Sequence, residues 1–156
     1  MQVLQSPPIQ GRAHSRAMTP TIAWNPDHTL NQPQMDRTHQ EFVDRLGALQ
    51  DAVRRAPHEV ADCVGELLRH TELHFEQEER WMLELGFGPE NCHAQEHASV
   101  LEVIREAQRR NTLAQDLDLL ETLTRALDEW FAVHATSMDA ALALVMSEKG
   151  FSPGRS

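Results

Sequence analysis

Four stretches of the chain repeat apolar residues at the three- and four-residue spacing of an α-helix, and no useful length alternates as a strand would. The first stretch begins at Met35 and ends before Pro57. The others cover about 58–85, 91–111 and 116–147, with Asn91 placed to cap the third. Four amphipathic stretches with short connections predict an all-α, up-down-up-down four-helix bundle preceded by an extended N-terminal arm.

The chain is long enough for one domain with a proper core and too short for a second. We expect a disordered tail over residues 1–20, the bundle domain over 21–148 and a C-terminal tail over 149–156. Trp24 is a lone large apolar residue in the arm. We therefore expect it to anchor the arm against the bundle.

Composition excludes several classes of partner. The formal net charge of −10, with no basic stripe, argues against nucleic acid and anionic membranes. Cys63 and Cys92 form no C-x-x-C pair, so an iron–sulfur or zinc-finger site is not expected. No apolar run of membrane-spanning length and no secretory signal are evident, so a cytoplasmic protein is predicted.

Histidines and carboxylates interrupt the apolar seams of all four stretches. His74 and Glu78 lie four residues apart, as do His93 and His97, so each pair shares one helix face. Burying such groups without partners would cost several kcal/mol, which indicates a metal site. The candidate ligands are His39, His74, Glu78, His93, His97, His134 and Asp139.

Asp139 does not fit the regular spacing, because it follows His134 by five residues and Met138 holds the four-residue position. Either Asp139 reaches in from the flank or a π-bulge brings it under His134.

The number of candidate ligands favours a centre with one vacancy. Two six-coordinate irons offer about twelve positions. If two carboxylates bridge with both oxygens and a solvent-derived oxygen also bridges, five histidines leave one position open. Such a centre suits one small diatomic molecule better than a bulky substrate.

The motifs MDRTHQEF (35–42), HFEQEERWM (74–82), GFGPENCHAQEH (86–97) and WFAVHATSMD (130–139) resemble the hemerythrin family, in particular its bacterial single-domain members. The resemblance implies two iron ions joined by an oxo or hydroxo bridge. His93, His97 and His134 would bind one iron, His39 and His74 the other, and Glu78 and Asp139 would bridge them. It implies reversible dioxygen binding rather than enzymatic activity, with nitric oxide or other small anions as further partners.

The same resemblance implies an apolar pocket beside the open iron. Its expected wall is made of Trp130, Phe131, Phe42, Phe75 and Met138.

Other polar residues are expected to lie outside the centre. His70 precedes His74 by one turn and is interpreted as a half-buried surface histidine, the alternatives being an eighth ligand or an outer partner. Glu79 is expected to face solvent or pair with an arginine. His14, His28 and His58 are expected to be solvated.

Two other functions fit the same residues. One is a di-iron enzyme with peroxidase-like or nitric-oxide-handling activity, and the other is a structural zinc or mixed-metal bundle. A ferritin-like centre is excluded, because it needs two Glu-x-x-His motifs on separate helices, and only Glu90 and His93 have that spacing.

Overall fold

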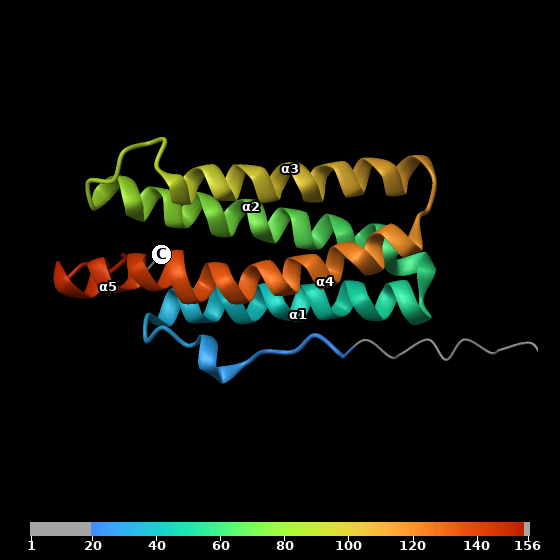
Figure 1. The fold of residues 1–156 in the computed structure, drawn as a ribbon, viewed down its shortest axis with the longest axis horizontal. Coiled ribbons are helices and arrows are strands. Elements are labelled where there is room, and N and C mark those ends of the chain that lie inside the picture. Colours follow the sequence, from blue (N-terminus) through green and yellow to red (C-terminus); the bar gives the residue numbers. More distant parts are fainter. Residues whose placement is uncertain (1–19, 155–156) are drawn as a thin grey trace, which may run out of the picture.

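The computed structural model describes residues 20–154, so nearly all of the predicted tail over 1–20, His14 included, lies outside the described residues. Four long helices run side by side (Figure 1). They are α1 (Pro33–Arg55), α2 (Val60–Glu84), α3 (Cys92–Leu113) and α4 (Leu117–His134). The short turns η1 (Pro26–His28) and η2 (Pro57–Glu59) precede α1 and α2. No strand occurs in 20–154, which confirms the all-α four-helix bundle.

The fourth helical stretch is continuous but not regular. Helix α4 passes through the π-helical turn η3 (Ala135–Asp139) into α5 (Ala140–Glu148). The combined stretch Leu117–Glu148 is long and apolar enough, by length and composition alone, to cross a membrane. The sequence expectation that no such stretch exists is therefore wrong. A core helix passes the same test, and Leu120, Leu127 and Phe131 of this stretch are buried in the bundle core.

Side-chain caps define the helix starts. Gln32 accepts a hydrogen bond from the Met35 amide at 2.7 Å, and Pro33 occupies the first turn, where a missing amide hydrogen costs nothing. Asn91 accepts from the Ala94 amide at 3.0 Å, so its predicted role as the cap of α3 is confirmed.

The apolar interior consists of two clusters. The larger contains Phe42, Leu46, Leu67, Ile104 and Leu127 among others, and extends toward the turn between α3 and α4. The smaller lies at the other end of the bundle and is made of Met35, Trp81, Met82, Leu85, Leu142, Ala143 and Met146. In α1, α2 and the α4–α5 stretch, His39, Glu78 and Asp139 lie between residues of the two clusters. A polar layer therefore crosses an otherwise apolar bundle.

The N-terminal arm packs on α1. Trp24 is half-buried against the larger cluster, as expected, but Ile22 is the more buried contact, at 9% exposure. The Ile22 amide donates to Gln50 Oε1 at 3.0 Å, and Gln50 Nε2 donates to the Pro20 carbonyl at 3.2 Å. At the other end of the chain, the Lys149 ammonium donates to the Leu85 carbonyl, and Phe151 packs on the smaller cluster. The described part of the predicted tail over 149–156 is thus partly docked.

Candidate metal centre

All seven predicted ligands come together in the polar layer, and every one is buried. His39 comes from α1, His74 and Glu78 from α2, and His93 and His97 from α3. His134 ends α4, and Asp139 ends the π turn. Their exposed fractions run from 0% to 7%. Seven polar side chains buried in one layer need partners there.

The ligand atoms form two overlapping groups. Within each group they lie within 4.8 Å of one another, a spacing that suits one metal ion. The first group is Glu78, His93, His97, His134 and Asp139, and the second is His39, His74 and Glu78. Three histidines thus face one position and two face the other.

Glu78 and Asp139 lie between the two histidine groups, and each divides its oxygens between them. Glu78 Oε1 is 2.7 Å from His74 Nε2, whereas Oε2 is 3.3 Å from His97 Nε2. Asp139 Oδ2 is 3.0 Å from His39 Nε2, whereas Oδ1 is 2.9 Å from His93 Nε2. A carboxylate placed this way is arranged to bridge two cations.

The π turn explains how Asp139 reaches the layer. Its wider ring lets five residues replace four, so Asp139, rather than Met138, lies under His134. Asp139 is fully buried, whereas Met138 is only half-buried. The seam beyond the turn moves by the same residue. Met146 is therefore buried, whereas Val145, which a regular helix would place on the seam seven residues after Met138, is only half-buried.

Two hydroxyls accompany the disturbed backbone. Thr136 donates to the Ala132 carbonyl at 2.7 Å, and Ser137 donates to the Val133 carbonyl at 2.6 Å. Carbonyls next to a π turn lose part of the regular ladder, and these hydroxyls supply donors there. The sequence ATSMD therefore suits the distortion.

Charge in the layer is strongly coupled. Burial would lower the pKa of His39, but the carboxylates of Asp139 and Glu78 outweigh it and raise that pKa to about 9. His93 is raised to about 9 for the same reasons. Burial would raise the pKa of Glu78, but the neighbouring imidazoles hold it well below its ordinary value. Without a metal, the protonated imidazoles of His39 and His93 therefore offset the charge of the two carboxylates.

Unsatisfied atoms indicate what the layer accommodates. Among the described residues, His39 Nε2, Glu78 Oε2 and both Asp139 oxygens are buried and close to one another but make no hydrogen bond of acceptable geometry. The Nε2 atoms of His93 and His134 face each other at 3.1 Å, and those of His97 and His134 at 3.2 Å. Adjacent nitrogens on one octahedral metal, each about 2.1 Å from it, are roughly 3.0 Å apart. The donor set fits metal ions.

Two outer carboxylates were missed by the sequence analysis. Glu96 Oε1 accepts from His134 Nδ1 at 3.1 Å and from the Trp130 indole at 2.6 Å. Glu79 Oε1 accepts from His97 Nδ1 at 3.3 Å, although its side chain is 41% exposed, so the expectation that it faces solvent is confirmed only in part. Only their positions in the sequence could have identified these two glutamates, because Glu96 directly precedes His97 and Glu79 directly follows Glu78.

Aromatic rings line the side of the polar layer that faces the larger core cluster. The Phe131 ring contacts the His39 ring edge-on, with the ring centroids 5.2 Å apart, and its centroid is 5.3 Å from that of Phe42. Phe75 stacks on His97 at 3.8 Å, and Trp130 stacks on His134 at 4.5 Å. Among the five expected wall residues, four therefore contact a ligand or another wall residue through their rings. The fifth, Met138, is half-buried and belongs to neither core cluster.

The other histidines within residues 20–154 lie outside the seven-residue layer. The His70 Nε2 atom is 3.1 Å from the Thr38 carbonyl, and burial lowers the pKa of His70 to about 4. This agrees with its interpretation as a half-buried histidine outside the ligand set. His58 is exposed, as expected. His28 is not, because its ring packs on Phe131 at 5.8 Å and on Trp24 at 6.1 Å.

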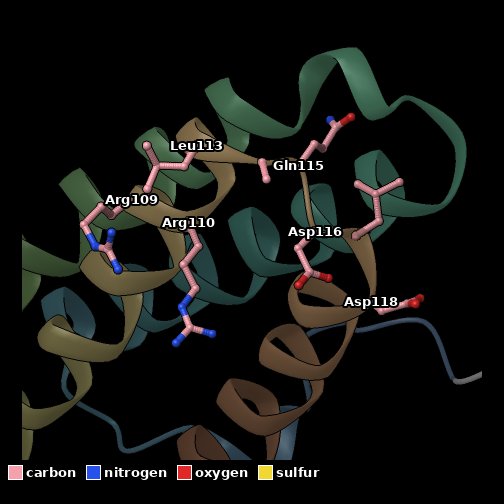
Figure 2. Close-up of a pocket in the computed structure, with 8 residues that line it drawn as sticks. Arg109, Arg110, Leu113, Gln115, Asp116 and Asp118 are labelled. Atoms are coloured by element: carbon pink, nitrogen blue, oxygen red, sulfur yellow. The ribbon is translucent and has the colours of Figure 1, made fainter.

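A hollow of about 750 Å³ lies at the turn between α3 and α4, where Arg109, Arg110, Asp116 and Asp118 are among the lining residues (Figure 2). None of the seven ligands lines it. His97 lies 16 residues before Leu113, which is about 24 Å along α3. This hollow is therefore a surface feature at the far end of the bundle from the polar layer.

Comparison with known proteins agrees with this geometry. The family described as Hemerythrin HHE cation binding domain matches residues 32–143. A bacteriohemerythrin of Ralstonia nicotianae is 35% identical over 134 residues, covering 84% of this chain and 93% of the relative. Bacteriohemerythrins of Pseudomonas paraeruginosa and Stenotrophomonas maltophilia are each 25% identical, covering 76% and 78% of this chain and 77% and 79% of those relatives. Because the family match spans all seven residues of the polar layer, this chain belongs to the hemerythrin family.

Proposed function

We propose that this chain is a non-haem di-iron protein that binds dioxygen reversibly. His93, His97 and His134 would hold one iron, and His39 and His74 the other. Glu78 and Asp139 would bridge them. The two overlapping ligand groups and the divided oxygens of both carboxylates support this assignment.

The unequal division of histidines carries the functional proposal. The position that His39 and His74 face has one protein nitrogen fewer than its neighbour. When bound, the irons would supply the electrons that reversible dioxygen binding requires. The vacancy would belong to the two-histidine position, which leaves room for one small molecule.

The surroundings of His39 support a small apolar ligand. Phe131 covers one edge of the His39 ring, and Phe42 packs behind Phe131. Both phenylalanines are buried, at 3% and 1% exposure. Apolar walls limit the entry of water and so preserve a reduced metal centre. We assign Phe131, Phe42, Phe75 and Trp130 to this wall and give Met138 a marginal place in it.

Storage, delivery and sensing of dioxygen are the roles that we propose for such a centre, and the affinity for dioxygen distinguishes them. The cytoplasmic location stays a prediction from the sequence. So does the boundary of the bundle domain at 21–148.

An anaerobic optical titration with iron analysis tests the proposal. We expect two irons per chain and a visible absorption that appears on exposure of the reduced protein to dioxygen and disappears under vacuum. Rapid, irreversible oxidation with turnover of peroxide or nitric oxide would instead support the enzyme. Zinc in place of iron after growth in iron-rich medium would contradict both functions.

Two histidine variants provide a matched pair for the ligand assignment. His97→Ala should lower the iron content and the absorption, because it removes one of three nitrogens at one position. His70→Ala should leave the iron content unchanged, since its ring binds the Thr38 carbonyl outside the layer. Normal iron in His97→Ala would remove His97 from the site.

A further inference from the structure

The two ends of the polar layer differ in the hydrogen-bond partners of their histidine Nδ1 atoms. At the three-histidine end, Glu96 accepts from His134 Nδ1 and Glu79 accepts from His97 Nδ1. At the two-histidine end, the Nδ1 atoms of His39 and His74 are buried and have no hydrogen-bond partner among the described residues. Among the described residues, outer carboxylates therefore support His97 and His134 at one position and neither histidine at the other.

Glu96 has the closer geometry of the two outer carboxylates. It lies on α3 and reaches α4, where one oxygen accepts from both His134 and Trp130. The Trp130 ring lies over the face of His134 with an interplanar angle of 27°. The imidazole is thus held on its edge by a carboxylate and on its face by an indole.

The contact also determines which nitrogen carries the proton. An ionised carboxylate only accepts hydrogen bonds, so Nδ1 of His134 must be the protonated nitrogen. The Nε2 lone pair then points into the layer, toward His93 and His97. Partners of this kind orient a ligand and raise its basicity, and their loss typically weakens metal binding about 10- to 100-fold.

We propose that Glu96, assisted by Glu79, is a positioning residue that makes the three-histidine end the tighter metal position, which fills first. The inference rests on the proposed metal site and adds an order of loading to it. Glu79 contributes less, because its contact with His97 is longer, at 3.3 Å, and its side chain is 41% exposed.

Stepwise Co²⁺ binding to the metal-free full-length chain tests the proposal. The wild-type protein should bind two ions in two separate steps. Glu96→Gln keeps the size of the side chain and one acceptor oxygen but removes the charge, so the first step should weaken at least about 10-fold while the second is unchanged. Glu79→Gln should weaken the same step by a smaller factor.

Two further variants separate this role from a structural one. Trp130→Phe removes the indole donor but leaves the Glu96 charge on His134, so it should weaken the first step less than Glu96→Gln does. Glu102→Gln removes a charge from an exposed position on α3, where Glu102 contacts Arg105, and should change neither step. If Glu96 only braced α3 against α4, Glu96→Gln and Trp130→Phe would weaken both steps alike.

The outcomes distinguish this inference from the proposed function. Wild-type protein that takes up no Co²⁺ would contradict the metal site itself. Two ions bound with an unchanged first step in Glu96→Gln would overturn only the positioning role. If Glu96→Gln fails to fold by circular dichroism, Glu79→Gln decides the question, because an unaltered first step there would also overturn the inference.

Discussion

Replacing Gly47 by alanine should destabilise the protein, whereas the same replacement at Gly65 should stabilise it. Both glycines lie inside long helices, Gly47 in α1 and Gly65 in α2. Alanine in a helix interior is favoured over glycine by about 1 kcal/mol. At Gly65 the new Cβ would lie 3.8 Å from Gln108 Nε2, an ordinary contact. At Gly47 it would lie 2.9 Å from the Ile22 carbonyl oxygen, which belongs to the backbone of the arm.

The cost at Gly47 follows from what holds the arm. If the arm moves away, the Gln50 side chain, only 1% exposed, loses its contacts with Ile22 and Pro20. A buried amide left without partners costs about 1–3 kcal/mol, and exposing Ile22 costs up to about 2 kcal/mol more. After subtracting the gain of about 1 kcal/mol in helix propensity, these costs leave a net loss of roughly 0–4 kcal/mol, centred on about 2 kcal/mol.

Denaturant unfolding at one fixed metal concentration measures both variants against the wild type. Hydrogen exchange at the Ile22 amide provides a local readout, and its protection should fall in Gly47→Ala alone. If Gly47→Ala were stabilised as much as Gly65→Ala, the arm would move without cost. The argument that α1 and the arm pack tightly at this point would then be refuted.

Three further predictions concern the polar layer. Phe131→Leu should retain iron, but its reduced metal centre should oxidise several-fold faster in air, because a smaller side chain admits water beside His39. An unchanged oxidation rate would show that Phe131 is not part of the pocket wall. Metal binding at pH 7 should release about two protons, because pKa values near 9 keep His39 and His93 protonated in the metal-free protein. The release should vanish well above pH 9. A pH indicator in weak buffer measures the release, and no release at pH 7 would contradict the charge assignment. Removing the metal with a chelator should lower the free energy of unfolding by about 4 kcal/mol for metal held at 1,000 times its dissociation constant, and an unchanged thermal midpoint would mean that the layer needs no metal.

The fold and the seven residues of the polar layer could be predicted because they depend on sequence periodicity. An apolar residue every three or four positions defines a helix face, and a histidine on that face must be buried with it. His39, His74 and Glu78 could therefore be identified from their places on a seam. Resemblance to a known family then supplied the division of the ligands between two positions.

The outer residues could not be identified in the same way. Glu96 and Glu79 lie beside the seams rather than on them, and sequence alone does not distinguish them from solvated glutamates. Their roles depend on which helix lies opposite them. Glu96 acts on His134 only because the packing of α4 brings Trp130 and His134 within hydrogen-bond distance of its carboxylate. The arm is similar, because His28 is covered only through the packing of Trp24 and Phe131.

The π turn shows how a break in periodicity can locate a functional residue. A regular helix would have placed Met138 under His134 and left Asp139 on the flank, with Val145 continuing the seam. In the structure, Asp139 and Met146 take the inner positions, so a single extra residue has shifted every position that follows. Such a turn gives up regular backbone hydrogen bonds, and the apolar packing of α5 alone gives no reason for it. The reason is the carboxylate, because only the shifted register brings Asp139 within 3.1 Å of three histidines from three different helices.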